Sequence, residues 1–273
     1  MPIVTLTTDI GPQDYLAGAI KGQLLSLNNT FNIVDITHYL SQANYPQAAY
    51  ICSNAFKYYP SDTFHIIILD LYANPIQHVL LARHKGQFII CPDNGILTMI
   101  AGERPQEIVA LPVGSKQTLL AITQLIAEAV NHISNGGDLF SVGSILTSID
   151  EKYPLRATIG NNWMEGQILF IDNFENVVIN ITREEFEEHR KGRSFKILFK
   201  RDETIDTISS EYATVYEGEK LAWFNSAGYL EIAVNKGNMA GLFGLQGFNE
   251  KMQRQAPALL NKWFYQTVRI FFE

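Results

Sequence analysis

Two aspartates stand just behind apolar segments that are typical of buried strands. Asp9 follows the β-branched residues 3–6 and two threonines, and Asp70 follows the almost unbroken apolar residues 64–69. The carboxyl ends of strands form the edge at which open α/β sheets bind ligands. Carboxylates at that edge suit hydroxyl or ammonium groups and not a phosphate. The alternative is that these residues only form turns, in which Asp is common.

Asp14 is placed to begin a helix after the turn at Gly11-Pro12. An Asp at this point would cap a helix that turns apolar side chains among residues 16–20 inward. The strand, turn and helix also bring Asp14 to the same edge as Asp9, where it could contact a ligand. Capping alone is the alternative.

The segment Asp172-Asn173-Phe174-Glu175-Asn176 offers a carboxylate, an aromatic face and two amides within one turn after a strand. An aromatic ring for stacking and an amide for the Watson–Crick edge are groups that recognise adenine. Residues 225–229 are similar, with the hydroxyl of Ser226 and a flexible glycine. A hairpin turn is the alternative for both segments. Asp93, in a Pro-Asp-Asn-Gly sequence, is most simply a turn residue.

The composition is that of a globular chain, with 273 residues, 47% hydrophobic and 18% charged. The formal charge of −7 disfavours nucleic acid as the main partner. No apolar segment is long enough to cross a bilayer, and the first residues lack a signal-peptide pattern. Cys52 and Cys91 are too few for a disulfide framework or a metal site. We therefore expect no cofactor, no metal and no membrane partner, and a cytoplasmic location.

Apolar periodicity predicts alternating strands and helices in the first half of the chain. Strands are expected over residues 3–6, 31–36, 64–69, 78–82 and 88–91, and helices after Asp14 and over 45–58, 96–100 and 118–133. This alternation favours an α/β domain with a mostly parallel sheet and flanking helices.

The second half consists of short, β-rich segments that are broken by turns. Strands are expected over residues 165–172, 177–181, 194–199, 220–225 and 229–234, and a charged helix over 182–190. Such spacing favours a smaller β-barrel-like domain. The predicted organisation is an N-terminal domain (1–155), a C-terminal domain (163–250) and an apolar, aromatic tail (251–273). We expect the tail to form a helix on its own subunit; contact with a neighbouring subunit is the alternative.

Several motifs together resemble the S-adenosylmethionine (SAM) hydroxide adenosyltransferases, a family that includes enzymes installing fluoride or chloride in place of hydroxide. The similar segments are Thr7-Thr8-Asp9-Ile10-Gly11 with Asp14-Tyr15, Asp35-Ile36-Thr37-His38, Ala48-Ala49-Tyr50, Tyr59-Pro60-Ser61-Asp62-Thr63, Pro92-Asp93-Asn94-Gly95-Ile96-Leu97, Ile171-Asp172-Asn173-Phe174-Glu175-Asn176 and Asn225-Ser226-Ala227-Gly228-Tyr229. They occur in the family's order and extend to about residue 247. The resemblance implies a homotrimer, with a site formed by the first domain of one subunit and the second domain of the next.

Members of this family cleave SAM with water to adenosine and methionine. A sulfonium is an excellent leaving group, so the enzyme mainly places a water in line and desolvates it. The resemblance implies Asp70 as a catalytic residue, but Gln77 stands where the family has an Arg and Ala121 where it has a His. Without a cationic partner, the carboxylate lacks the field that orients and deprotonates water. His78 could substitute, although we favour a surface strand histidine.

The resemblance also implies which residues contact the ribose and methionine parts of the ligand. Asp9 would accept hydrogen bonds from both ribose hydroxyls. Asp14 and Ser226 would hold the ammonium and carboxylate of methionine.

A second group of residues is implied for the adenine end of the ligand. Phe174 and Tyr212 would face the ring, Asn176 would read its edge, and Asp172 would face the ligand. The function hypothesis is a SAM hydroxide adenosyltransferase-like protein with weak or lost activity. The alternative is a non-catalytic trimeric module that binds an adenine nucleoside.

Overall fold

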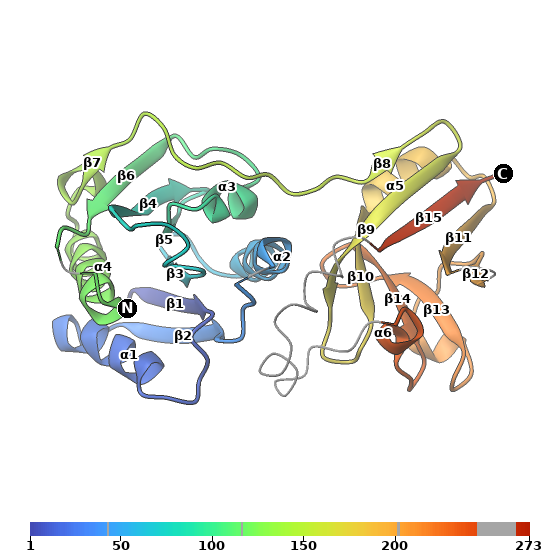
Figure 1. Cartoon of the computed structure of the whole chain (residues 1–273), viewed down its shortest axis with the longest axis horizontal. Coiled ribbons are helices and arrows are strands. Elements are labelled where there is room, and N and C mark those ends of the chain that lie inside the picture. The colour runs from blue at the N-terminus through green and yellow to red at the C-terminus, as the bar shows by residue number, and fades with distance from the viewer. Residues whose placement is uncertain (43, 116, 201–202, 245–265) are drawn as a thin grey trace. The chain divides into compact units, whose positions relative to one another are not determined.

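The computed structural model describes the chain except for residues 43, 116, 201–202 and 245–265 (Figure 1). The chain divides into two compact units, Met1–Pro154 and Leu155–Glu273.

The first unit is a seven-stranded, mostly parallel sheet with helices on both faces (Figure 1). Its strands are β1 (Ile3–Thr8), β2 (Asn32–Thr37), β3 (Phe64–Ile68), β4 (His78–His84), β5 (Gln87–Pro92), β6 (Glu107–Pro112) and β7 (Ser144–Ile145), in the order β2-β1-β3-β5-β4-β6-β7. β1 pairs in parallel with β2 and β3, and β3 with β5; β4 is antiparallel to β5 and β6, and β7 to β6. The α/β class predicted from the alternating pattern is confirmed.

The helices pack in two pairs, one on each face of this sheet. They are α1 (Leu16–Leu27), α2 (Tyr45–Phe56), α3 (Ile96–Ala101) and α4 (Leu119–Ser134), followed by the short η1 (Leu139–Ser141). Ile66 of β3 belongs to the core beneath α1 and α4, and Ile67 to the core beneath α2 and α3. Successive strand residues point to opposite faces, so a strand covered on both faces is apolar throughout.

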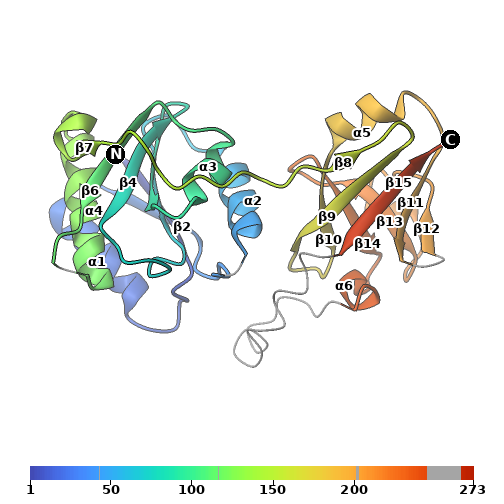
Figure 2. The same ribbon diagram turned by 45° about the horizontal axis from the view of Figure 1, so that its top comes forward.

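The second unit is an antiparallel sheet that is nearly closed into a barrel-like form (Figure 2). Its strands are β8 (Thr158–Ile159), β9 (Trp163–Ile171), β10 (Val177–Thr182), β11 (Phe195–Lys200), β12 (Glu203–Ile205), β13 (Lys220–Phe224), β14 (Tyr229–Val234) and β15 (Thr267–Phe272). Their order is β12-β11-β15-β9-β10-β14-β13, with β8 paired to β9. The two edge strands approach each other, and Lys220 of β13 forms an ion pair with Glu203 of β12. The predicted barrel-like domain is confirmed.

The described residues of this unit also form two short helices, α5 (Arg183–Arg190) and α6 (Met239–Leu242), and the 3-10 turn η2 (Tyr212–Thr214). Thr182 and Glu185 form a capping box at the start of α5. The fully buried Phe186 of α5 packs against three phenylalanines of the sheet. These are Phe195, Phe224 and Phe272.

The end of the C-terminal tail corrects the sequence interpretation. Residues 267–272, expected in a helix, form β15, which lies between β11 and β9. Val268, Ile270 and Phe272 are buried and alternate with exposed residues, as a strand requires. Leu259, Leu260, Trp263, Phe264 and Tyr265 lie outside the described residues.

Candidate active site

The aspartates that follow β1 and β3 lie next to each other at the carboxyl edge of the sheet. β1 and β3 are parallel neighbours in which Thr8 pairs with Ile68. The Asp9 N–H donates to the Ile68 carbonyl over 3.0 Å, and the Asp70 N–H donates to Asp9 Oδ2 over 2.8 Å. The adjacency of the two strand ends therefore places both carboxylates in one site.

Asp70 has an unusual backbone conformation, with φ of 48° in the left-handed region. Asp tolerates this region better than most residues, but the conformation is still strained and needs support from its surroundings. The Asp9 carboxylate supplies it by accepting the Asp70 N–H, and the Asp70 carbonyl accepts the Ala73 N–H over 3.1 Å. Strain of this kind is concentrated at functional sites, which supports a role for Asp70.

Tyr45, the first residue of α2, completes the cluster around Asp70. Its hydroxyl donates to Asp70 Oδ2 over 3.2 Å. Burial, followed by the charge of Asp70, raises the pKa of Tyr45, so the hydroxyl stays a donor at neutral pH. Tyr45 also interacts with Asn94, whose amide donates to the Leu69 carbonyl over 2.9 Å. The sequence interpretation treated Tyr45 only as a helix residue and Asn94 only as part of a turn.

Asp9 is held in a partly desolvated position. Burial raises the pKa of Asp9, and the charge of Asp70 adds to this effect. Hydrogen bonds from the Asp70 N–H and the Gln42 side chain oppose it without cancelling it. Asp9 is thus a half-buried acceptor whose charged form is costly until a ligand or proton compensates it.

The positions implied for the missing catalytic partners lie at this same edge. β4 is antiparallel to β5, with Val79 opposite Pro92, so Gln77 and His78 stand beside the end of β5. Ala121 follows β6 in the first turn of α4, and the Val113 N–H after β6 donates to the Gln77 carbonyl over 3.0 Å. The structure therefore places Asp70 and Gln77 on loops, and Ala121 in the first turn of α4, at one edge of the sheet; neither Gln77 nor Ala121 carries a charge.

His78 is not the plain surface residue that the sequence interpretation favoured. Its Nε2 lies 2.9 Å from Asp93 Oδ2, and its side chain is only 24% exposed. The other oxygen of Asp93 accepts the Asp150 N–H over 2.8 Å, so Asp93 does more than form a turn. His78 and Asp93 form a histidine–carboxylate pair of the kind that can move a proton.

Asp14 does not occupy the N-cap position of α1 that the sequence predicts for it. It precedes the N-cap residue Tyr15, and its carboxylate accepts the Leu16 N–H over 2.8 Å. Its side chain is exposed, so the bond to the helix leaves room for a ligand. Contact with methionine remains a prediction.

In the second unit, Asp172 organises the hairpin between β9 and β10. One carboxylate oxygen accepts the N–H groups of Phe174 (2.9 Å) and Asn176 (2.8 Å). Asp172 therefore serves the turn, which was the alternative reading. The Phe174 ring is 75% exposed and presents a face on which a base could stack.

Ser226 lies exposed in the turn between β13 and β14.

Asn176 and Tyr212 belong to a buried polar network centred on Glu231. The Asn176 amide nitrogen contacts Asp172 Oδ2 (3.0 Å), the Tyr212 hydroxyl (2.5 Å) and Glu231 Oε1 (3.1 Å). Trp223 Nε1 also donates to Glu231 Oε1, over 2.8 Å. An amide has only two hydrogens to donate. Contact of this nitrogen with adenine would therefore require an exchange of partners.

The sequence interpretation missed Glu231 as the centre of this network. Its signal is a carboxylate inside the apolar segment 229–234, where it is only 4% exposed. Buried carboxylates need donors, so such a position indicates a polar network.

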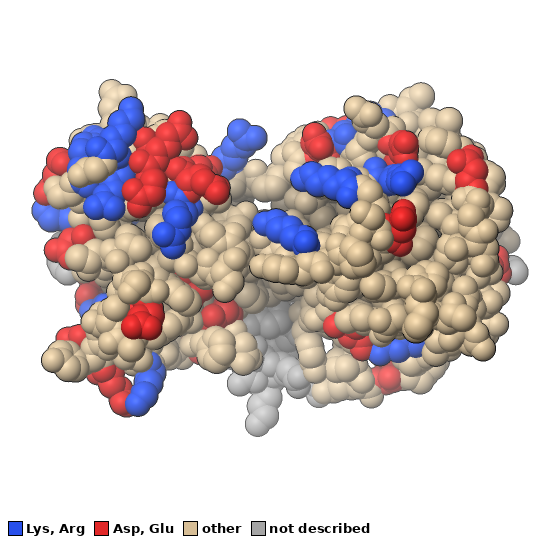
Figure 3. Space-filling model, turned by 180° about the vertical axis from the view of Figure 1, so that it is seen from behind, with Lys and Arg blue, Asp and Glu red and all other residues tan. Residues whose placement is uncertain are grey.

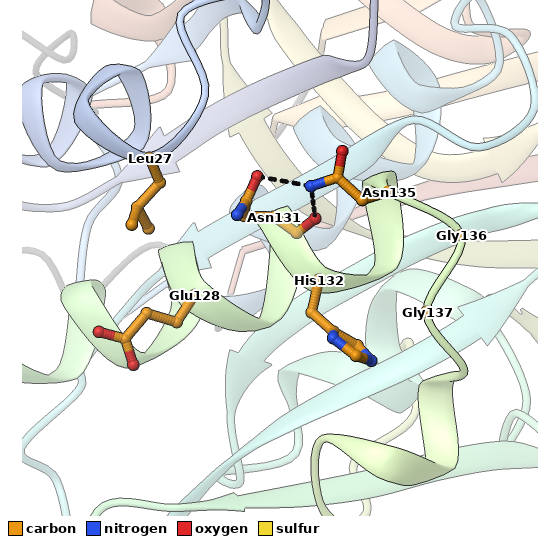
Figure 4. A pocket seen from close by; sticks show the side chains of 7 residues that line it. All are labelled: Leu27, Glu128, Asn131, His132, Asn135, Gly136 and Gly137. Carbon is orange, nitrogen blue, oxygen red and sulfur yellow. Dashed lines mark hydrogen bonds between the residues drawn. The ribbon is translucent and has the colours of Figure 1, made fainter.

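Two pockets in the described part of the chain lie away from this edge. One, of about 520 Å³, is lined by Leu27, the end of α4 and Gly136-Gly137 (Figure 4). Another, of about 610 Å³, includes Ile3 and Phe64, the first residues of β1 and β3. Asp9 and Asp70 follow the opposite ends of those strands. The candidate site is therefore defined by the side-chain contacts around Asp9 and Asp70 and not by these pockets.

None of the His, Cys, Asp and Glu side chains of the described residues gather in a group that could hold a metal ion. Every helix in this part of the chain is too short or too polar to span a membrane. Basic and acidic side chains are interspersed on the face shown in Figure 3.

The family assignment comes from both halves of the chain. Residues 4–143 match the SAM hydroxide adenosyltransferase N-terminal domain, and residues 166–250 match the C-terminal domain. The chain therefore belongs to the SAM hydroxide adenosyltransferase family.

Relatives with assigned activities are similar over nearly their whole length. An (R)-S-adenosyl-L-methionine hydrolase of Methanocaldococcus jannaschii is 24% identical, over 92% of this chain and 95% of the relative. A hydrolase of the same name from Thermus thermophilus is 23% identical, over 89% and 96%. A fluorinase of Actinopolyspora mzabensis is 23% identical, over 93% and 97%. An uncharacterized conserved protein of Thermotoga maritima has the same fold, with a TM-score of 0.80 at 22% identity over 98% of this chain and 99% of that one.

Proposed function

We propose that this protein binds SAM and cleaves it with water to adenosine and methionine, slowly, with a reduced catalytic set and without a cofactor. The observation that carries the proposal is the cluster of Asp9, Asp70 and Tyr45 at the carboxyl edge of the sheet. The Asp70 carboxylate accepts the Tyr45 hydroxyl, which leaves acceptor positions for a water. Such a water could attack the ribose carbon as the sulfonium leaves.

For this reaction, the protein mainly has to position the attacking water relative to SAM. Methionine leaves as a neutral thioether, so no proton has to reach the leaving group, while the attacking water loses one proton. Asp70 can take part in that step directly or through solvent. Because Gln77 and Ala121 are uncharged, we expect slower turnover than in a relative with a cation beside its catalytic carboxylate.

The test is incubation with SAM and chromatography for adenosine and methionine, with Asp70→Asn as the matched variant. Asn keeps the size and one acceptor but cannot hold a negative charge. We expect slow adenosine formation by the wild type and a further loss of at least about 100-fold in Asp70→Asn. Wild-type protein that neither binds SAM nor forms adenosine would contradict the proposal.

A second candidate is a binding module without catalysis. Uncharged Gln77 and Ala121 favour it, because both expected catalytic partners are absent together. Calorimetry with SAM, adenosine and methionine separates the candidates, since a module binds a nucleoside tightly and forms no product.

Contacts to adenine, ribose and methionine are proposed for the ligand-binding set from the sequence. The set is Asp9, Asp14, Asp172, Phe174, Asn176, Tyr212 and Ser226. We also propose a homotrimer. Sedimentation that gives only monomer at micromolar concentration would contradict this assembly.

A further inference from the structure

Asp9 and Asp70 bring two carboxylates together without an ion pair. Among the described residues, the ion pairs include neither of them. Like charges in a partly desolvated site repel each other, so an opposite charge nearby would stabilise the ionised pair. A cation does lie beside this cluster, on the far side of the Tyr45 ring.

That cation is Lys152. Its Nζ lies 3.9 Å from the centroid of the Tyr45 ring, and the hydroxyl of the same ring donates to Asp70 Oδ2 over 3.2 Å. A cation over an aromatic face is attracted by the negative charge of that face. The ring therefore connects Lys152 to Asp70, with the ammonium on its face and the carboxylate at its hydroxyl.

The segment that carries Lys152 is tied to the first unit through its backbone. The Lys152 N–H donates to Thr98 Oγ1 over 2.9 Å, and the hydroxyl of Thr98 donates to the Lys152 carbonyl over 2.6 Å. Glu151 forms a bridge with Gly95, and the Asp150 N–H donates to Asp93. These contacts fix the Lys152 backbone independently of its side chain, so a substitution at this position should leave the fold intact.

The side chain of Lys152 is also guided towards Tyr45. It crosses Gly95 so closely that a Cβ there would lie 2.5 Å from Lys152 Cγ. Gly95 has a φ of 92°, which favours glycine and leaves the space open for the lysine stem.

We propose that Lys152 is a positioning residue for the Asp70 carboxylate, acting through the Tyr45 ring. It stabilises the position of the ring and adds positive charge beside the two carboxylates. The inference concerns the site of the proposed function and rests on Asp70 being its reactive carboxylate. The groups in direct contact with Asp70 are Asp9, through the bond to the Asp70 N–H, and the Tyr45 hydroxyl.

The test uses the full-length protein without any ligand. Protein with ¹³C-labelled aspartate carboxyl groups is observed by NMR at neutral pH and low salt, and the Asp70 resonance is assigned by its loss in Asp70→Asn. In Lys152→Met we expect the Asp70 carboxyl resonance to move from its wild-type position, because the cation acts on the carboxylate across the width of the ring. Lys152→Arg should restore the wild-type position, and high salt should shrink the difference.

Lys57 provides the matched control. It lies just beyond the other end of α2, about 18 Å along the helix from Tyr45, and its Nζ donates to Asn54 over 2.8 Å. Lys57→Met removes one positive charge just beyond the far end of α2 and should leave the Asp70 resonance unchanged. An equal shift in both methionine variants would overturn the proposal, because it would reflect net charge alone.

A double-variant cycle tests the route through Tyr45. Tyr45→Leu removes the ring electrons and the hydroxyl while it keeps apolar bulk, so Lys152→Met should have little further effect in that background. If Lys152→Met has the same effect in the Tyr45→Leu background as in the wild type, Lys152 does not act through the Tyr45 ring and the proposal is overturned. A lower melting temperature of Lys152→Met with an unchanged Asp70 resonance would mean a purely structural role. Because no ligand is used, failure of this proposal is distinguishable from failure to bind or cleave SAM.

Discussion

Asp9 combines a structural and an electrostatic role that substitutions can separate. Its carboxylate accepts the N–H of the strained Asp70, and burial raises its own pKa. Asp9→Ala removes the acceptor and the charge together. Asp9→Asn removes the charge but keeps an oxygen that can accept the Asp70 N–H.

We predict that Asp9→Ala and Asp9→Asn both weaken nucleoside binding, Asp9→Ala by about tenfold or more, since each charge-assisted bond contributes roughly 1.5–3 kcal/mol. Calorimetric titration with adenosine measures this loss. Asp9→Ala should also lower the melting temperature, because the Asp70 N–H loses its acceptor at a cost of about 1–3 kcal/mol. Unchanged affinity in Asp9→Asn would mean that this carboxylate does not hold the ribose.

The raised pKa of Asp9 also predicts that the free energy of unfolding depends on pH. A carboxyl group whose pKa is raised by folding contributes stability below its unfolded pKa, and this stability is lost as the pH rises through its folded pKa. Asp9→Asn should therefore be more stable than the wild type at neutral pH, because the amide carries no charge to desolvate. The gain should disappear in acid, where Asp9 is protonated. Chemical denaturation at two pH values measures it.

His65 gives a pH dependence of the opposite sign. It is fully buried, stacks on Phe56 and lies 2.7 Å from the Thr5 hydroxyl. Burial lowers the pKa of His65 to about 4, from 6.5. Its stability contribution is complete above the unfolded pKa and is lost as the pH falls towards 4. The loss is about 3 kcal/mol, because one pKa unit corresponds to roughly 1.4 kcal/mol. The difference between the unfolding free energies at neutral and acid pH should therefore be smaller in His65→Gln than in the wild type.

At the scale of elements, β15 ties the chain terminus into the middle of the second sheet. It pairs with β9 on one side and β11 on the other. Removing it would leave both neighbours with unpaired edges. Residues 267–272 are thus part of the fold of this unit and not an appendage to it.

We predict that Ile270→Ala lowers the free energy of unfolding by about 2–4 kcal/mol, because this fully buried side chain would leave a cavity. Phe271→Ala, one residue along the strand and 38% exposed, is the matched control and should cost much less. Urea denaturation compares the two. An equal loss of unfolding free energy in the two variants would contradict the assignment of Ile270 to the buried face of β15 and of Phe271 to its exposed face.

At the scale of the whole molecule, each unit has its own core. The core clusters of the described residues draw their members from one unit only, either before Pro154 or after Leu155. Cooperative folding needs a contiguous core, and each unit has one.

We therefore predict that a fragment of residues 155–273 folds without the first unit. It should give a β-type circular dichroism spectrum and a sigmoidal thermal transition. The matching fragment of residues 1–154 should give a mixed α/β spectrum. A fragment of residues 155–273 that unfolds without a cooperative transition would show that its core needs the first unit.

The elements of this protein were predictable because their signals are local. The continuous apolar segment of β3 and the period of 3.6 in α4 reflect which faces are buried, and neighbouring residues reveal this. The sequence also indicated that Asp9 and Asp70 lie close together, because both follow strands and parallel strands end at one edge of the sheet. The helix expected at the chain terminus was wrong over β15, where the alternation of Val268, Arg269 and Ile270 was overlooked.

The contacts that define the site depended on the tertiary structure. Tyr45 reaches Asp70 from a helix, and Lys152 reaches Tyr45 from a segment more than a hundred residues further along the chain. The pairing of His78 with Asp93 follows from the antiparallel placement of β4 beside β5. Sequence periodicity records whether a side chain is buried, but not which distant side chain it meets. That depends on the packing of whole elements, so the fold was predictable while the surroundings of Asp70 were not.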